Sequence, residues 1–231
     1  MKFGRWIIVT MTAVLALMAA PIAEANTGAQ KLERLAIAQS QQLFKYYYGK
    51  PQSASPMFCS QAQSKDGVFL LPTASFWGGD RDFRCKIKTR SVVVDLGGYV
   101  PTEDNRPGSV YELPNGEKLT FAKENLERIC DAILDGFEPG TATLDGREIT
   151  GVPVSTSTFP VKINRTANND PLFFYEDSKN LGHPGRLTSC YSGVKAIVGL
   201  SPGRHVLRVD LTELFGGTST VMTYHILATR H

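Results

Sequence analysis

The chain has 231 residues, of which 20% are charged and 10% aromatic, and its formal net charge is +3 at pH 7. A charge this small gives no argument for a nucleic-acid partner or for binding to an anionic membrane surface. The length is enough for one large β domain or two small ones with a sizeable buried core, and we favour one.

Residues 1–25 have the features of a secretory signal peptide. Two basic residues precede an apolar run from Trp6 to Ala20, and Ala23-Glu24-Ala25 offers a small-residue cleavage site. The run is short for a membrane anchor, and no stop-transfer pattern follows it. We therefore expect a protein that is secreted or periplasmic, with residues 26–231 forming a single secreted β-rich domain that has no membrane anchor after cleavage.

Four cysteines lie after the predicted cleavage site, and in an oxidising compartment they are expected to form two disulfides: Cys59, Cys85, Cys130 and Cys190. No C-x-x-C pair is present to support a zinc ribbon or a thioredoxin-type redox site. Three pairings are possible. We prefer Cys85 with Cys130, which joins a strand start to an inward helix face, and Cys59 with Cys190. A cysteine nucleophile is the alternative.

The first predicted element is a helix at about residues 30–48, because apolar residues there fall near helical spacing. After a loop that carries Cys59, strands are expected at 67–72 and 83–96. Cys85 and every second residue through Val93 would share one face of the second strand. Alternate positions from Arg84 to Arg90 are basic, which is typical of a solvated face. A face for an anionic ligand is the alternative.

A loop at residues 97–114 follows, and long loops on a rigid sheet are common binding sites. The alternative is a plain surface excursion. A second helix is expected around Phe121 to Leu134, with Thr120 as its cap, because Leu126, Ile129 and Cys130 recur on one face.

The rest of the chain is predicted to be strands and turns. Expected strands lie at 141–144, 148–154, 196–200, 204–211 and 221–227. Asp145-Gly146 and Ser201-Pro202-Gly203 are turn signals. The fold class is therefore mostly β, a β-sandwich-like single domain with two helices and two disulfides. Asn164-Arg165-Thr166 fits the glycosylation sequon.

Motifs that would indicate chemistry are absent from the sequence. It has no H-E-x-x-H, no G-x-S-x-G and no Gly-rich phosphate loop, so we predict no cofactor and no metal, and catalytic residues are unknown. His205 and His225 lie on strands that can be neighbours, which leaves a histidine pair open as a metal site. A Ser-His-Asp triad assembled in space is also open.

Several short motifs, taken in order, resemble a family of exported, largely uncharacterised bacterial and archaeal proteins. They are Cys59-Ser60-Gln61 before Gly67-Val68-Phe69-Leu70-Leu71, Arg84-Cys85-Lys86-Ile87, Leu144-Asp145-Gly146-Arg147, Ser189-Cys190-Tyr191, and Leu200-Ser201-Pro202-Gly203-Arg204-His205 before Thr223-Tyr224-His225. The resemblance covers most of the mature chain and implies a secreted β fold. It carries over no activity and no catalytic residues.

The leading hypothesis is a non-catalytic exported module that binds carbohydrate or protein of the envelope or extracellular space. Its candidate ligand-binding residues are Phe76, Trp77 and Tyr99, since exposed aromatic residues on loops suit such ligands. One alternative is a secreted hydrolase with Asp95, Glu103 or Asp104 near His183 or His205. A second alternative is a structural or host-interaction factor.

Overall fold

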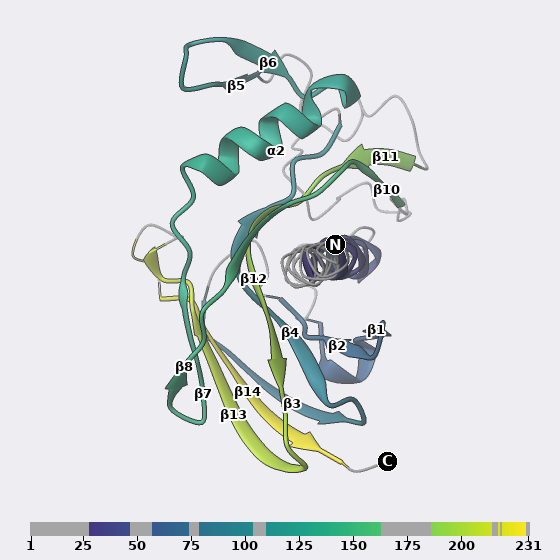
Figure 1. Cartoon of the computed structure of the whole chain (residues 1–231), viewed down its shortest axis with the longest axis vertical. Helices are drawn as coiled ribbons and strands as arrows, with labels where there is room; N and C mark the ends of the chain where they lie inside the picture. Colours follow the sequence, from purple (N-terminus) through teal and green to yellow (C-terminus); the bar gives the residue numbers. More distant parts are fainter. Residues whose placement is uncertain are drawn as a thin grey trace, which may run out of the picture.

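The computed structural model describes residues 28–46, 57–73, 79–103, 110–162, 186–213, 217 and 219–229. Two five-stranded sheets dominate it (Figure 1). Sheet A has the order β1 (Ser64–Lys65), β2 (Val68–Leu70), β4 (Ser91–Tyr99), β12 (Ser192–Gly199) and β9 (Val152–Ser155). Sheet B has the order β3 (Arg81–Ile87), β14 (Val221–Ala228), β13 (Gly203–Asp210), β7 (Thr141–Leu144) and β8 (Arg147–Glu148).

Shorter elements surround these sheets. Two small sheets pair β5 (Val110–Glu112) with β6 (Lys118–Thr120) and β10 (Phe159–Lys162) with β11 (Arg186–Ser189). The helices are an N-terminal helix at residues 28–46, the short η1 (Cys59–Gln61) and η2 (Lys123–Asn125), and α2 (Leu126–Asp135). The fold is thus mostly β and sandwich-like, as predicted.

The main core lies between the two sheets. Strands of sheet B follow the expected alternation, so that Met222, Tyr224 and Ile226 of β14 are buried while the residues between them are more exposed. From sheet A, Val92 and Val94 join the same cluster. Burial of alternate residues on a pleated strand is what drives the two sheets together.

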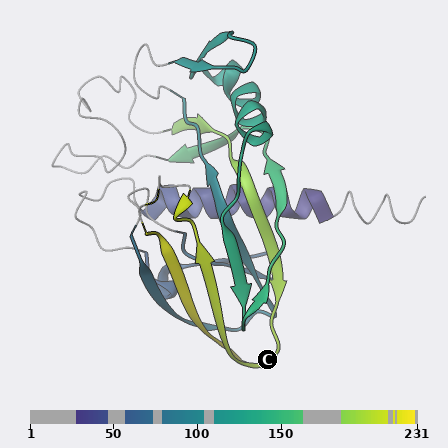
Figure 2. The same cartoon turned by 90° about the vertical axis from the view of Figure 1, so that its left-hand side faces the viewer.

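Sheet A is buried on its second face as well, because the N-terminal helix packs there. Leu35 and Phe44 of this helix cluster with Val93, the β4 residue between the two core valines. The helix crosses the strands rather than running along them (Figure 2). Burial on both faces explains why β4 contains an uninterrupted apolar run.

The disulfide pairing differs from the one we preferred. Cys59 is bonded to Cys85, with Cα atoms 5.1 Å apart, and Cys130 is bonded to Cys190, with Cα atoms 6.4 Å apart. Cys130 points inward from α2, as expected, but α2 packs on β12, and Cys190 lies just before that strand. Cys85 lies in β3 of sheet B, and η1, which contains Cys59, packs on β3.

Three local expectations were wrong. The run 83–96 is two strands, because the chain crosses from sheet B to sheet A at residues 88–90. The run 148–154 is likewise divided between β8 and β9, in different sheets. Thr120 belongs to β6, and α2 begins after η2 without a side-chain cap.

Within the described residues, no helix is long and apolar enough to span a membrane.

Candidate functional site

A cleft of about 1150 Å³ opens between the end of β4, the strand β5 and the C-terminal end of α2. The N-terminal helix closes its inner side through Gln39 and Leu43. Its volume is somewhat larger than the range of about 300–1,000 Å³ that is typical of small-molecule sites. The predicted loop region therefore forms part of a concave surface, since Tyr99, Val100 and Pro101 all line it.

Aromatic side chains stand around this cleft. Tyr99 is 53% exposed, and its ring meets that of Phe137 edge to face, with centroids 6.0 Å apart. Tyr111 and Phe121 contribute to the lining from β5 and from the segment before α2. Such flat apolar faces with a polar edge are suited to stacking on ring-shaped ligands.

The charged residues of the lining have one sign. Among the described residues, those that line the cleft include carboxylates and no lysine or arginine: Asp95, Glu112, Asp135, Glu138 and Glu213. Two of these carboxylates have a nearby cation: Lys118 Nζ lies 3.6 Å from Glu112, and Lys195 Nζ, beneath the lining, lies 2.7 Å from Asp95. The cleft therefore favours neutral or cationic ligands over anions.

A hydrogen-bonded network around Asp95 lies directly beneath the lining. Lys195 Nζ lies 2.7 Å from Asp95 Oδ2 and 2.7 Å from Gln39 Oε1, and Tyr191 Oη donates to Asp95 Oδ1 over 3.0 Å. Lys195 Nζ also lies 4.1 Å from the centroid of the Tyr191 ring. Gln39 Nε2 donates to the carbonyl of Leu71. Every buried polar group named here has a partner, which makes this floor rigid.

Burial sets the ionisation of this network. It raises the pKa of Tyr191 well above its usual value, and the neighbouring carboxylate of Asp95 acts in the same direction. Burial lowers the pKa of Lys195, against the opposite effect of Asp95. Tyr191 is therefore a neutral donor at pH 7. Its hydroxyl is committed to Asp95 and to the carbonyl of Gly97.

A glycine pair in β4 makes room for this arrangement. Gly97 has a positive φ of 106°. A Cβ atom on Gly98 would lie 2.6 Å from Tyr191 Oη, closer than side chains tolerate. Gly97-Gly98 therefore places the tyrosine beneath the cleft, whereas from the sequence we interpreted the pair only as the start of a loop.

The candidate site residues that we predicted from the sequence lie in different parts of the molecule. Tyr99 lies in the cleft, while Phe76, Trp77, Asp104 and His183 lie outside the described residues. The carboxylate of Glu103 accepts a hydrogen bond from the backbone of Thr188 over 2.9 Å.

Sequence reasoning missed the floor of the site. The available signal was a lone lysine, Lys195, within the otherwise apolar run 193–198. A buried charge in a strand requires partners, and these come from distant segments.

His205 is held in a structural ion pair at the other end of the sandwich. Its Nδ1 lies 2.7 Å from Asp145 Oδ2, and its Nε2 lies 2.8 Å from the carbonyl oxygen of Ser201. The Ser201 hydroxyl is 3.5 Å from Nε2. This combination has the composition of a Ser-His-Asp triad, but a carbonyl occupies the nitrogen that a general base would need.

The proposed histidine pair is not formed. His205 lies opposite Ile226 in the β13–β14 register, whereas His225 lies opposite Val206, so the two imidazoles lie on opposite faces of sheet B. Within the described part of the chain, no group of three or more His, Cys, Asp or Glu side chains is placed to hold a metal ion.

Comparison with known proteins gives no relative for this chain. No family model, no curated protein and no solved structure matches it. The family resemblance noted in the sequence stays an expectation, and the function has to be argued from the geometry of the cleft.

Proposed function

We propose that this protein is an exported, non-catalytic binding module that holds a carbohydrate of the envelope or extracellular space in the cleft beside α2. The observation that carries the proposal is the ring of aromatic side chains above a rigid polar floor. Sugar rings present apolar faces that stack on aromatic residues and hydroxyl groups that hydrogen-bond to carboxylates. Tyr99 and Phe137 offer aromatic faces for stacking, and the carboxylates of the lining offer hydrogen-bond acceptors for the hydroxyl groups.

Export is supported by two features of the chain. The first 25 residues have the pattern of a signal peptide, and the two disulfides are those of a protein in an oxidising compartment, periplasmic or extracellular. The small net charge and the acidic lining speak against nucleic acid as the ligand.

The test is glycan binding with a matched pair of variants. Tyr99 and Phe58 are equally exposed, at 53% and 54%, but only Tyr99 lines the cleft. Oligomers of N-acetylglucosamine at a hundred times their Kd should stabilise the protein by about 2.7 kcal/mol in a thermal-shift assay. Tyr99→Ala should weaken binding about tenfold, because stacking of one ring is lost. Phe58→Ala should leave the Kd unchanged.

Two results would contradict the proposal. One is the absence of binding across neutral and amino-sugar oligomers; the other is an equal loss of affinity in the two variants. The oligomers should be recovered intact after incubation, since cleavage would instead support the hydrolase alternative.

A further inference from the structure

The outer face of sheet B gathers basic residues at the end of its strands. In the strand register, Leu227 of β14 lies between Lys86 of β3 and Arg204 of β13. Neighbouring strands are about 4.8 Å apart, so the Cα atoms of Lys86 and Arg204 are about 10 Å from each other. In the next outward row, Arg84 lies beside His225. All of these side chains are exposed.

The basic residues continue around the tip of the sandwich. Lys88 and Arg90 are exposed in the connection from β3 to β4. Together with Arg84, Lys86 and Arg204 they form what we call the basic face. In the described part of the chain none of the five is in an ion pair: the ion pairs of sheet B are made by Arg208, His205 and His225.

Two acidic groups of sheet B lie away from this tip, and a third, Asp145, lies at the tip beside His205. Asp82 is at the start of β3, where it lies 3.6 Å from His225 Nε2, and Asp210 is at the end of β13, paired with Arg208. The strand β3 runs toward the tip and β13 runs away from it. The start of β3 and the end of β13, which carry these two carboxylates, are therefore both far from the tip. Asp145 is occupied by His205.

Apolar side chains are exposed among the cations. Leu227 is 41% exposed and Val206 46% exposed on the same outer surface. This surface therefore combines positive charge with exposed apolar side chains. It matches the phosphate layer of a bilayer, which supplies negative charge together with apolar depth. A purely hydrophilic polyanion would leave the two aliphatic side chains without a partner.

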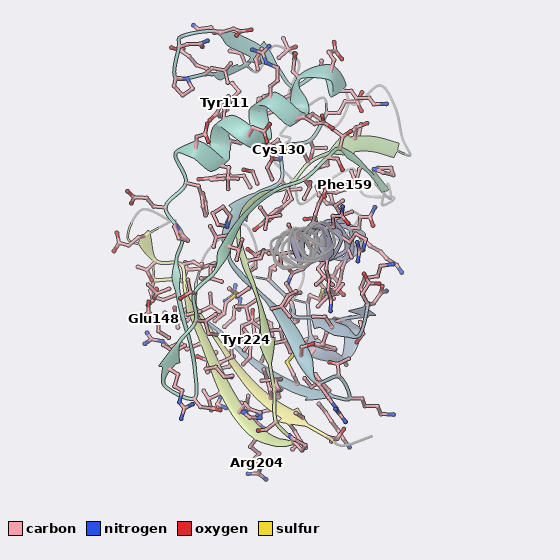
Figure 3. The ribbon with its side chains drawn as sticks, viewed as in Figure 1. Tyr111, Cys130, Glu148, Phe159, Arg204 and Tyr224 are labelled. Carbon is pink, nitrogen blue, oxygen red and sulfur yellow. A yellow bond between two sulfur atoms is a disulfide. The ribbon has the colours of Figure 1, made fainter. Side chains whose placement is uncertain are left out.

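We propose that the basic face docks on the phosphate headgroups of an anionic lipid bilayer. Figure 3 shows Arg204 at the end of the molecule that is far from Tyr111 and α2. Docking through this tip would therefore turn the cleft away from the membrane. The formal net charge of +3 gives no sign of this face, because the positive charges of the tip and the negative charges of the distant cleft cancel in the sum.

The experiment is flotation of the purified, disulfide-bonded protein with vesicles. At about 50 mM salt, the protein should float together with vesicles of phosphatidylcholine and phosphatidylglycerol. At about 300 mM salt it should stay behind, because exposed charges are then screened. Each cation near such a surface changes partitioning about fivefold. The double variant Lys86→Gln/Arg204→Gln should therefore partition about 25-fold less.

A second double variant serves as the matched control. Lys45→Gln/Lys123→Gln removes the same charge from two exposed positions outside the basic face and should partition within about twofold of the unchanged protein. Equal losses in the two double variants would overturn the proposal, since net charge alone would then explain binding. Failure to float with anionic vesicles, equal flotation with pure phosphatidylcholine, or binding to soluble dextran sulfate without binding to vesicles would also overturn it.

Discussion

Lys195 is the residue whose removal should cost the most stability for its size. It is fully buried and its ammonium group neutralises Asp95, whose side chain is only 16% exposed. Lys195→Met removes the counter-charge of the carboxylate and leaves Asp95 Oδ2 and the Gln39 amide oxygen without the donor they share. We expect a loss of about 3 kcal/mol in the free energy of unfolding, measured by denaturant titration.

The double variant Lys195→Met/Asp95→Asn is the control for this first prediction. Removing both charges avoids an uncompensated buried ion, so it should be more stable than Lys195→Met alone. A single variant as stable as the exposed change Lys45→Met would contradict the ion-pair argument.

The His205–Asp145 pair should give stability a pH dependence of defined sign. The hydrogen bond with Asp145 raises the pKa of His205 above 6.5, and the same bond lowers the pKa of Asp145 below 3.8. Stability from a raised histidine pKa is complete below pH 6.5 and disappears as the pH rises through the folded pKa. Stability from a lowered aspartate pKa is complete above about pH 4 and disappears as the pH falls. The pair therefore stabilises most between these values.

His205→Gln tests this second prediction. Because the Asp145 side chain is 49% exposed, solvent screens the pair, and we expect a contribution of no more than about 1 kcal/mol. Thermal unfolding of both proteins should differ most between about pH 4 and pH 6.5 and converge as the pH rises through the raised pKa of His205. A difference that is constant from pH 5 to pH 9 would show that the imidazole acts by packing alone.

At the scale of elements, the Cys130–Cys190 disulfide fixes one wall of the cleft. It closes a sequence separation of 60 residues and holds α2 beside the start of β12. Replacing both cysteines by alanine should cost about 4 kcal/mol by loop entropy. We expect faster amide exchange in α2 and weaker glycan binding, since Ile133 and Asp135 of α2 line the cleft.

The other disulfide provides the comparison. Cys59–Cys85 closes a separation of 26 residues and ties η1 to β3, neither of which supplies a lining residue. Its removal should cost about 3.5 kcal/mol and leave glycan affinity of the folded protein unchanged. An equal loss of glycan affinity in the two double variants would contradict the assignment of α2 to the site.

The bounds of strands with one solvent-exposed face were predictable from the sequence, whereas the bounds of strands buried on both faces were not. β14 lies within one residue of its predicted end because its alternation is regular. β4 has no such alternation, because the N-terminal helix covers its second face, so its boundary with β3 was missed. The disulfide pairing and the Gln39–Lys195 contact depend on long-range packing, which no local pattern encodes.

At the scale of the whole molecule, the one-signed cleft predicts selectivity for ligand charge. Glucosamine oligomers should bind several-fold more tightly than N-acetylglucosamine oligomers of the same length at low salt, and the two Kd values should converge at high salt. Glu138→Gln should reduce the difference, whereas Glu148→Gln, outside the cleft, should not. Tighter binding of the neutral oligomer would refute charge selectivity while leaving carbohydrate binding itself in place.

The position of β14 in sheet B has a consequence for how the chain folds. It pairs in parallel with β3, about 140 residues earlier, and antiparallel with β13. It is therefore an interior strand of sheet B although it is the last of the described strands along the chain. Until β14 has been synthesised, β3 has no partner in sheet B. Sheet B therefore cannot nucleate from its N-terminal strands, and we expect slow, late folding dominated by non-local contacts. Late closure of sheet B would suit the export proposed above, because a chain that has not yet folded can pass through a secretion channel.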